Sequence, residues 1–274
     1  MPELPEVETV VRGLSASITG SRIRAVRLRR KDLRFPFPRG FAAALAGARI
    51  LGVSRRAKYL LFTLDNDYSI ISHLGMSGRF IIPALVAGSG LSKHDHVIIT
   101  LDDGRTLIYN DPRRFGVMTL VKTADATRHP LLRNLGPEPL SSDFTASYLK
   151  AELLRRKGAV KPVLMDQKLV VGVGNIYASE ALFLAGIDPR MSAPKAAPEA
   201  ALLVKSIRKV LRDAIASGGS SLRDFVHISG ESGYFQHRFN VYGREGEPCF
   251  ACKTPLRGIR QAGRATFYCP KCQR

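Results

Sequence analysis

The feature that most constrains this chain is the placement of its cysteines near the C-terminus. They form two C-x2-C pairs separated by sixteen residues, and thiolates at this spacing can surround one tetrahedral Zn²⁺. Four protein ligands leave no open coordination position, so the metal is expected to be structural. Two disulfides or two redox pairs are the alternative, which a reducing compartment disfavours. The expected zinc ligands are Cys249, Cys252, Cys269 and Cys272.

The segment between the two pairs is predicted to be a hairpin clamped by the metal. Gly258 and Gly263 are typical of turns. About forty residues rarely bury a sufficient hydrophobic core unless a bound metal stabilises the fold. Residues 236–274 hold eight Lys or Arg against two Glu, a local excess of 8 − 2 = +6. A DNA-contacting hairpin and a passive staple with a solvated basic face both fit this charge.

The overall charge points to a polyanionic partner. The 274 residues include 42 Lys and Arg against 23 Asp and Glu, a formal net charge of +19. No apolar run is long enough for a membrane span, and the acidic N-terminus does not resemble a secretory signal. We therefore expect a soluble, intracellular protein that faces nucleic acid. A basic peripheral membrane protein would need a basic amphipathic helix, and none stands out.

The N-terminal half reads as short strands separated by turns, preceded by a helix over 7–17. Asp102-Asp103-Gly104 predicts a hairpin turn, and close turn signals of this kind favour an antiparallel β-sandwich. The expected strands are 22–28, 59–64, 97–101, 105–109 and 117–121.

Helical periodicity begins after a stretch rich in Pro and Gly at 134–140. The clearest helix is 199–217, where Leu or Ile recurs every four residues, and 144–157 and 175–184 are two more. The fold class is thus α+β and multidomain. The expected parts are a β-sandwich domain with an N-terminal helix (1–134), a linker (135–143), a helical domain (144–235) and a four-Cys zinc finger (236–274).

The first residues could carry covalent chemistry. Pro2 is small enough for the initiator Met to be removed, which would leave a free secondary amine able to attack a carbonyl-equivalent carbon. Glu3 follows directly, and a carboxyl among apolar neighbours can act as a general acid. From these residues alone, a plain entry into a helix is the more common explanation.

The start of the chain, Met-Pro-Glu-Leu-Pro-Glu-Val-Glu-Thr, resembles that of the formamidopyrimidine-DNA glycosylases. Further motifs in order extend the resemblance to the last cysteine, so it covers essentially the whole chain. Leu4 favours the oxidised-purine branch of the family over the endonuclease VIII-like branch. The other motifs are Arg56-Ala-Lys58-Tyr-Leu, His73-Leu-Gly-Met-Ser-Gly78, Lys93-His-Asp-His96, Asp111-Pro-Arg-Arg-Phe-Gly116, Gly172-Val-Gly-Asn-Ile-Tyr-Ala-Ser-Glu180 and Gly233-Tyr-Phe-Gln.

The resemblance implies a catalytic role for four residues. Pro2 would attack the anomeric carbon of the sugar as the base leaves, and Glu3 would donate a proton that opens the sugar. Lys58 would assist β-elimination and touch phosphate, while Arg264 on the zinc hairpin would assist δ-elimination. Taken singly, Lys58 and Arg264 would pass for ordinary surface charges.

The resemblance also implies a helix–two-turns–helix, whose Gly-rich turn before Asn175 would present N–H groups to a phosphate. Met76, Arg113 and Phe115 match the residues that fill the space left by a flipped base, with Arg113 bonding the orphan base, implied to be cytosine. Without the resemblance, Met76 and Phe115 would pass for core residues. The segment 217–234 would cover the flipped base. The further DNA contacts implied are His94, Arg156, Lys161 and Asn175.

These expectations describe a bifunctional glycosylase and lyase of bacterial base-excision repair that removes oxidised purines such as 8-oxoguanine. Its expected partner is damaged double-stranded DNA in the cytoplasm, with one structural Zn²⁺, no small-molecule cofactor, no membrane and a monomeric state. Two alternatives stay open: an enzyme for oxidised pyrimidines, and a DNA-binding homologue without catalysis. The presence of Pro2, Glu3, Lys58 and Arg264 argues against the second.

Overall fold

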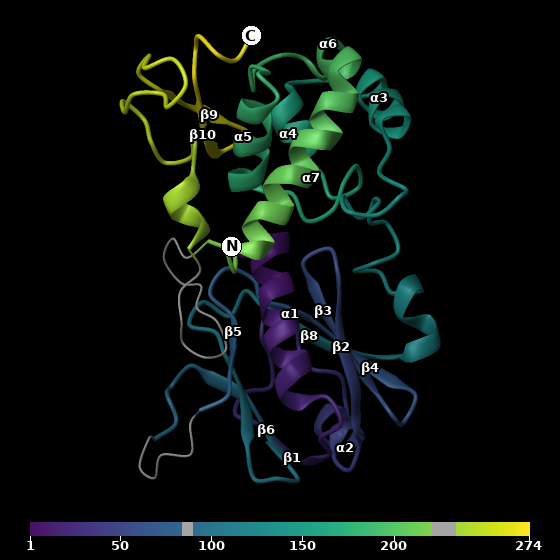
Figure 1. Cartoon of the computed structure of the whole chain (residues 1–274). Helices are drawn as coiled ribbons and strands as arrows, with labels where there is room; N and C mark the ends of the chain where they lie inside the picture. Colours follow the sequence, from purple (N-terminus) through teal and green to yellow (C-terminus); the bar gives the residue numbers. More distant parts are fainter. Residues whose placement is uncertain (84–89, 221–233) are drawn as a thin grey trace. The chain divides into compact units, whose positions relative to one another are not determined.

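The computed structural model describes residues 1–83, 90–220 and 234–274 (Figure 1). The chain forms two compact units, each with its own core. The first unit holds the described residues 1–2, 6–83, 90–133 and 218–220; the second holds 3–5, 134–217 and 234–274. No helix in the described part of the chain has the length and apolar character that crossing a membrane requires.

The first unit is an antiparallel β-sandwich flanked by a helix. One sheet has the strand order β1-β6-β7-β5 and the other β2-β3-β4-β8, and residues from both sheets share one core. The strands are β1 (Ile23–Leu28), β2 (Ile50–Arg56), β3 (Tyr59–Leu64), β4 (Tyr68–His73), β5 (Arg79–Ile81), β6 (Asp95–Leu101), β7 (Thr106–Asn110) and β8 (Val117–Lys122), with the short helix α2 (Phe41–Leu45) and a 3-10 helix at Thr123–Arg128.

Helix α1 (Leu4–Ile18) begins earlier than the helix predicted over 7–17. Pro5 fits the first turn, where a helix needs no N–H donor, and the N–H of Leu4 bonds the carbonyl of Gly172. One face of α1 carries Val7, Val10, Val11, Leu14 and Ile18 into the sandwich core at helical spacing.

The second unit is helical and ends in a β-hairpin. Its largest helix is amphipathic, and residues Leu203, Ile207 and Leu211 enter the core, as their four-residue spacing predicts. The elements are α3 (Ala146–Arg155), α4 (Val160–Leu164), α5 (Asn175–Leu184), α6 (Ala193–Ala196), α7 (Ala200–Ala216), β9 (Arg257–Gln261) and β10 (Arg264–Tyr268), with 3-10 helices at Ala197–Glu199 and Phe235–Arg238.

The predicted α+β class, the sandwich and the C-terminal hairpin are confirmed. The sequence pattern misses α4 and α6 because each is about one turn long and contains a proline. It also misses β2, β4 and β5 as separate strands. The hairpin predicted at Asp102-Asp103-Gly104 joins β6 to β7, and Gly104 has a φ of 86° there.

Candidate active site and DNA-contacting residues

The carboxylate of Glu3 lies at the N-terminus of α5. Its Oε1 accepts a hydrogen bond from the N–H of Ile176 at 3.0 Å, and its Oε2 accepts one from Tyr177 at 3.4 Å. Glu3 is 3% exposed, and the two N–H donors fix the position of its buried carboxyl group. The resemblance implies a phosphate at this helix N-terminus; in the structure Glu3 accepts hydrogen bonds from two of its N–H groups.

The turn between α4 and α5 is built to receive that carboxylate. A Cβ on Gly174 would lie 2.3 Å from the Cδ of Glu3, so only glycine leaves room. Gln167 braces the turn: its amide donates to the carbonyls of Met165 and Val173, both at 3.0 Å, and accepts from the N–H of Gly172 at 2.8 Å. Two helices and this turn form the predicted helix–two-turns–helix.

Lys58 lies in the turn between β2 and β3, in the first unit. It follows Ala57, whose φ is 55°, and is only 5% exposed. A surface lysine would be solvated, so burial excludes the ordinary surface charge that the sequence alone suggests.

Beside Lys58, the ring of His73 ends β4 and is held neutral. Its pKa is lowered to about 4, mainly by burial and in part by the charges of Lys58, Arg34 and the α-amino group of Met1. Its Nδ1 accepts a hydrogen bond from the N–H of Gly75 at 2.9 Å. The start of the chain and Lys58 therefore act on the same imidazole, in a strongly positive part of the first unit.

Three of the implied DNA contacts share two neighbouring turns of the first unit. Met76 is 37% exposed in the turn after β4, and Phe115 is 46% exposed in the turn before β8. The guanidinium of Arg113 lies 4.7 Å from the ring centre of Phe115. The carbonyl of His94 accepts a hydrogen bond from the N–H of Asp111, which starts that second turn. Met76 and Phe115 are thus not core residues.

Lys161 is 1% exposed and its ammonium group is used inside the second unit. Its Nζ donates to Oδ1 of Asn175 at 2.5 Å, to Oγ1 of Thr266 at 2.7 Å and to the carbonyl of Ala265 at 3.1 Å. Burial lowers its pKa to about 8, against a smaller opposing effect of Glu3. Lys161 therefore fastens β10 to α4 and α5.

Arg264, by contrast, is exposed at the start of β10. It follows a two-residue turn in which Ala262 and Gly263 have φ of 47° and 77°, as a tight hairpin requires. Arg264 and Lys161 both line a pocket of about 200 Å³. Asn175 bonds the residue after Arg264, donating from Nδ2 to the carbonyl of Ala265 at 2.9 Å.

Arg156 is engaged in two ion pairs within the second unit. Its guanidinium bonds Asp166, and also Glu152 at 3.1 Å. The neighbouring Arg155 is much more exposed. A DNA contact by Arg156 would therefore share its guanidinium with two carboxylates.

The four cysteine sulfurs lie within 4.8 Å of one another. The Cys252 and Cys269 sulfurs are 3.4 Å apart and those of Cys249 and Cys272 3.9 Å, too far for disulfides. Four thiolates around Zn²⁺ at about 2.3 Å would lie about 3.8 Å apart, so the donor set fits one tetrahedral zinc. These residues would hold the ion, and it would supply a structural clamp on the hairpin.

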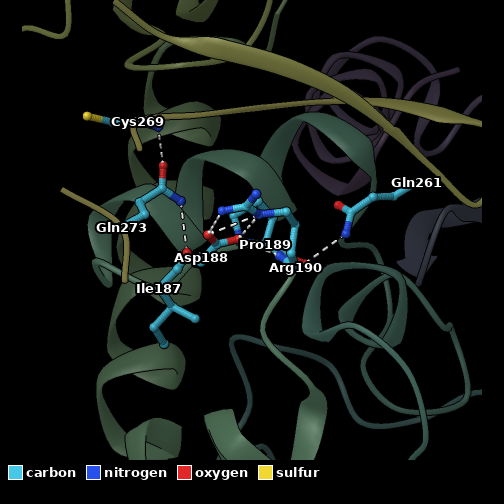
Figure 2. Close-up of polar contacts among 7 residues, drawn as sticks. All are labelled: Ile187, Asp188, Pro189, Arg190, Gln261, Cys269 and Gln273. Atoms are coloured by element: carbon cyan, nitrogen blue, oxygen red, sulfur yellow. Dashed lines mark hydrogen bonds and ion pairs between the residues drawn. The ribbon is translucent and has the colours of Figure 1, made fainter. Parts of the chain in front are cut away.

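The zinc-binding segment is attached to the end of α5 by Gln273, which is 2% exposed. Its side chain accepts from the N–H of Cys269 and donates to the carbonyl of Ile187, both at 2.8 Å (Figure 2). Nearby, Gln261 donates to the carbonyl of Pro189 at 3.0 Å. The hairpin is therefore held from both ends against the segment that follows α5.

Three family models match successive parts of the chain: the formamidopyrimidine-DNA glycosylase N-terminal domain (1–118), the H2TH domain of that enzyme (135–226) and a zinc finger found in FPG and IleRS (246–274). Formamidopyrimidine-DNA glycosylases of Ruegeria sp. (strain TM1040) and Bartonella tribocorum are 50% and 49% identical, each over 100% of both chains. This chain belongs to the formamidopyrimidine-DNA glycosylase family.

Solved structures of the glycosylase family agree. The MutM (Fpg) protein from Thermus thermophilus is 41% identical and superposes with a TM-score of 0.88 over 99% of this chain and 98% of its own. The Lactococcus lactis Fpg bound to DNA with an abasic site is 36% identical, with a TM-score of 0.90 over 99% of each chain. A MutM bound to DNA containing carbocyclic 8-oxo-G is 37% identical, with a TM-score of 0.91 over 100% of each chain.

His73 and Glu180 both lie in motifs shared with the glycosylases, but the sequence by itself predicts no role for either residue. Glu180 is 1% exposed and accepts four hydrogen bonds from the segment Asn240–Tyr242. That segment brings the Tyr242 hydroxyl to the Asn175 amide at 3.2 Å. The signal available in the sequence is the position of Glu180 among apolar residues of the predicted helix 175–184. Most of the segment expected to cover a flipped base, 221–233, lies outside the described residues.

Proposed function

We propose that this chain is a bifunctional DNA glycosylase and abasic-site lyase of bacterial base-excision repair, acting on oxidised purines. One observation carries the proposal: the carboxylate next to Pro2 in the sequence is fixed at the N-terminus of α5 by two N–H groups. A carboxyl held so firmly beside a chain-terminal amine suits an acid that serves that amine.

The chemistry starts after removal of Met1. The Pro2 nitrogen forms a bond to C1′ of the sugar and loses its N–H proton, while the bond from C1′ to the base breaks and the departing base takes up a proton. Glu3 protonates the ring oxygen as the C1′–O4′ bond opens, giving an iminium ion. The iminium acidifies C2′–H, so loss of that proton expels the 3′ phosphate and a second elimination expels the 5′ phosphate.

The other residues hold and release the DNA. Lys58, beside the neutral His73, assists the first elimination and binds phosphate; Arg264 assists the second. Met76, Arg113 and Phe115 fill the gap left by the flipped base. His94, Arg156 and Asn175 bind the DNA backbone, and Lys161 supports Asn175 and the hairpin. The work divides between a catalytic domain (1–134), a helical DNA-binding domain (144–235) and a zinc finger (236–274) in a cytoplasmic monomer.

The test is borohydride trapping on a duplex containing 8-oxoguanine opposite cytosine. Zinc-loaded protein with Met1 removed, checked by mass spectrometry, should form a covalent adduct. Pro2→Gly should form far less, and Pro5→Gly, which changes a proline in the same segment, should form the adduct normally. A parent protein that forms no adduct contradicts the proposal.

One observation favours the alternative that the enzyme also acts on oxidised pyrimidines. A Lactococcus lactis Fpg that is 37% identical to this chain, with a TM-score of 0.91 over 100% of both chains, has been solved with DNA containing an oxidised pyrimidine. Equal trapping on duplexes with 8-oxoguanine and with thymine glycol would favour a broad lesion range over a purine enzyme.

A further inference from the structure

Two turns of the first unit carry the residues proposed to enter the DNA. One runs from Leu74 to Gly78 after β4, and the other from Asp111 to Gly116 before β8. Their tips expose Met76 and Phe115, while the residues beneath are buried. This arrangement suggests that the buried residues of the two turns determine where the exposed side chains at the tips lie.

The two turns touch through backbone atoms. A Cβ on Gly75 would lie 2.5 Å from the carbonyl carbon of Phe115. Cβ atoms on Gly78 and Gly116 would lie 2.2 Å and 1.8 Å from the hydroxyl oxygen of Tyr109, which is buried beneath both turns. Side chains at these three glycines would push the turns apart.

Asp111, which is fully buried, joins the turns by hydrogen bonds. Its Oδ1 accepts from the Ser77 hydroxyl at 2.6 Å, and its Oδ2 accepts from the N–H of Gly116 at 2.8 Å. The Ser77 oxygen in turn accepts from the N–H of Arg113 at 3.1 Å. The hydroxyl of Ser77 therefore bridges the turn that carries Met76 to the turn that carries Arg113.

The main chain of Asp111 extends the network. Its carbonyl is 2.9 Å from Nε2 of His96, and its N–H donates to the carbonyl of His94 at 3.0 Å. One buried aspartate thus holds both turns and the start of β6.

We propose that Ser77 and Asp111 are positioning residues that hold the turn of Met76 and the turn of Arg113 and Phe115 together as one wedge. This rests on the proposed function, because the wedge is useful only to an enzyme that removes a base from the stack. Three side chains must enter one gap at once, and a preset spacing lowers the entropy cost of that step. The hydrogen bonds of Ser77 and Asp111, here called the clamp, therefore determine how well the orphan base is recognised.

The test is Ser77→Ala, which removes two hydrogen bonds and leaves Met76, Arg113 and Phe115 in place. Excision of 8-oxoguanine opposite cytosine should fall about tenfold in kcat/KM, mostly through KM, and the preference for cytosine over adenine as the opposite base should shrink. Excision of the lesion opposite a one-nucleotide gap, where there is no orphan base to hold, should be unchanged.

Ser72→Ala is the matched control. Ser72 is buried in β4 of the same unit, and its hydroxyl has no hydrogen-bond partner among the described residues. Asp111→Asn tests the clamp from the other turn and should show the same signature as Ser77→Ala. In the Arg113→Ala background, Ser77→Ala should cost little further discrimination.

Three results overturn the inference: unchanged discrimination between opposite bases, equal loss on the duplex and the gapped substrate, or failure of both variants to fold. The first two leave the proposed function intact if the parent protein still forms its borohydride adduct. Absence of that adduct in the parent would instead contradict the proposed function itself.

Discussion

Glu3 and Ile176 stand 173 positions apart, yet the carboxylate of the first accepts a hydrogen bond from the N–H of the second at 3.0 Å. This contact places the third residue of the chain at the positive end of α5. It joins the residue proposed as the acid to the helix–two-turns–helix of the same unit.

Replacing Glu3 by Gln should lower base excision about 10²–10³-fold, because an amide can accept the N–H of Ile176 but cannot donate a carboxyl proton. Single-turnover excision of 8-oxoguanine measures the effect. Glu199→Gln, a change at an exposed site before α7, should leave the rate unchanged. A Glu3→Gln enzyme with the parental rate would remove Glu3 from the mechanism.

Gly174→Ala should displace Glu3, since the new Cβ would lie 2.3 Å from its Cδ. We expect a loss of about 1–3 kcal/mol in the free energy of unfolding and a fall in excision like that of Glu3→Gln. Urea denaturation and single-turnover assays measure the two. The control is Gly52→Ala in β2, where a Cβ would meet nothing within 4 Å. Normal activity in Gly174→Ala would contradict the close fit.

The neutral state of His73 should make stability depend on acid. Its pKa is about 4 in the fold and 6.5 as a free side chain, so between these values only the unfolded chain takes the proton. The contribution of His73 to the free energy of unfolding is therefore complete above pH 6.5. It is lost as the pH drops toward 4, which lowers the free energy of unfolding by about 3 kcal/mol. Urea denaturation at pH 7 and pH 4.5 measures it.

His73→Asn keeps an acceptor for the N–H of Gly75 and should flatten that profile. His129→Asn, in a less buried position, should leave most of it. An identical pH profile in the parent and His73→Asn would show that other groups cause the acid dependence.

Gln273→Glu should loosen the zinc finger. The carboxylate can still accept from the N–H of Cys269 but cannot donate to the carbonyl of Ile187, which leaves two acceptors facing each other. We expect faster zinc loss to a chelator and a stop at the β-elimination product, because Arg264 lies on the same hairpin. Zinc content and gel analysis of the cleaved strands measure these. Lys271→Ala, at an exposed site nearby, is the control; parental zinc retention in Gln273→Glu would contradict the docking role.

Much of the local structure follows from short-range pattern. The span of α5, the strand Tyr59–Leu64, the hairpin between β6 and β7, and the four-Cys site were all predicted, because each depends on residues close together in the chain. The short helices α4 and α6 were missed, since one helical turn shows no periodicity and tertiary packing stabilises it.

The linear order of residues was enough for the zinc site, the strand and helix periods, and the list of chemically able side chains. Folding decided what those side chains do: it placed Glu3 on α5, turned Lys161 inward to Asn175 and β10, buried Lys58 beside His73, and joined Ser77 to Asp111. Each of these pairs joins residues from different secondary-structure elements, and their charge states and partners depend on burial and distance, which no local pattern contains.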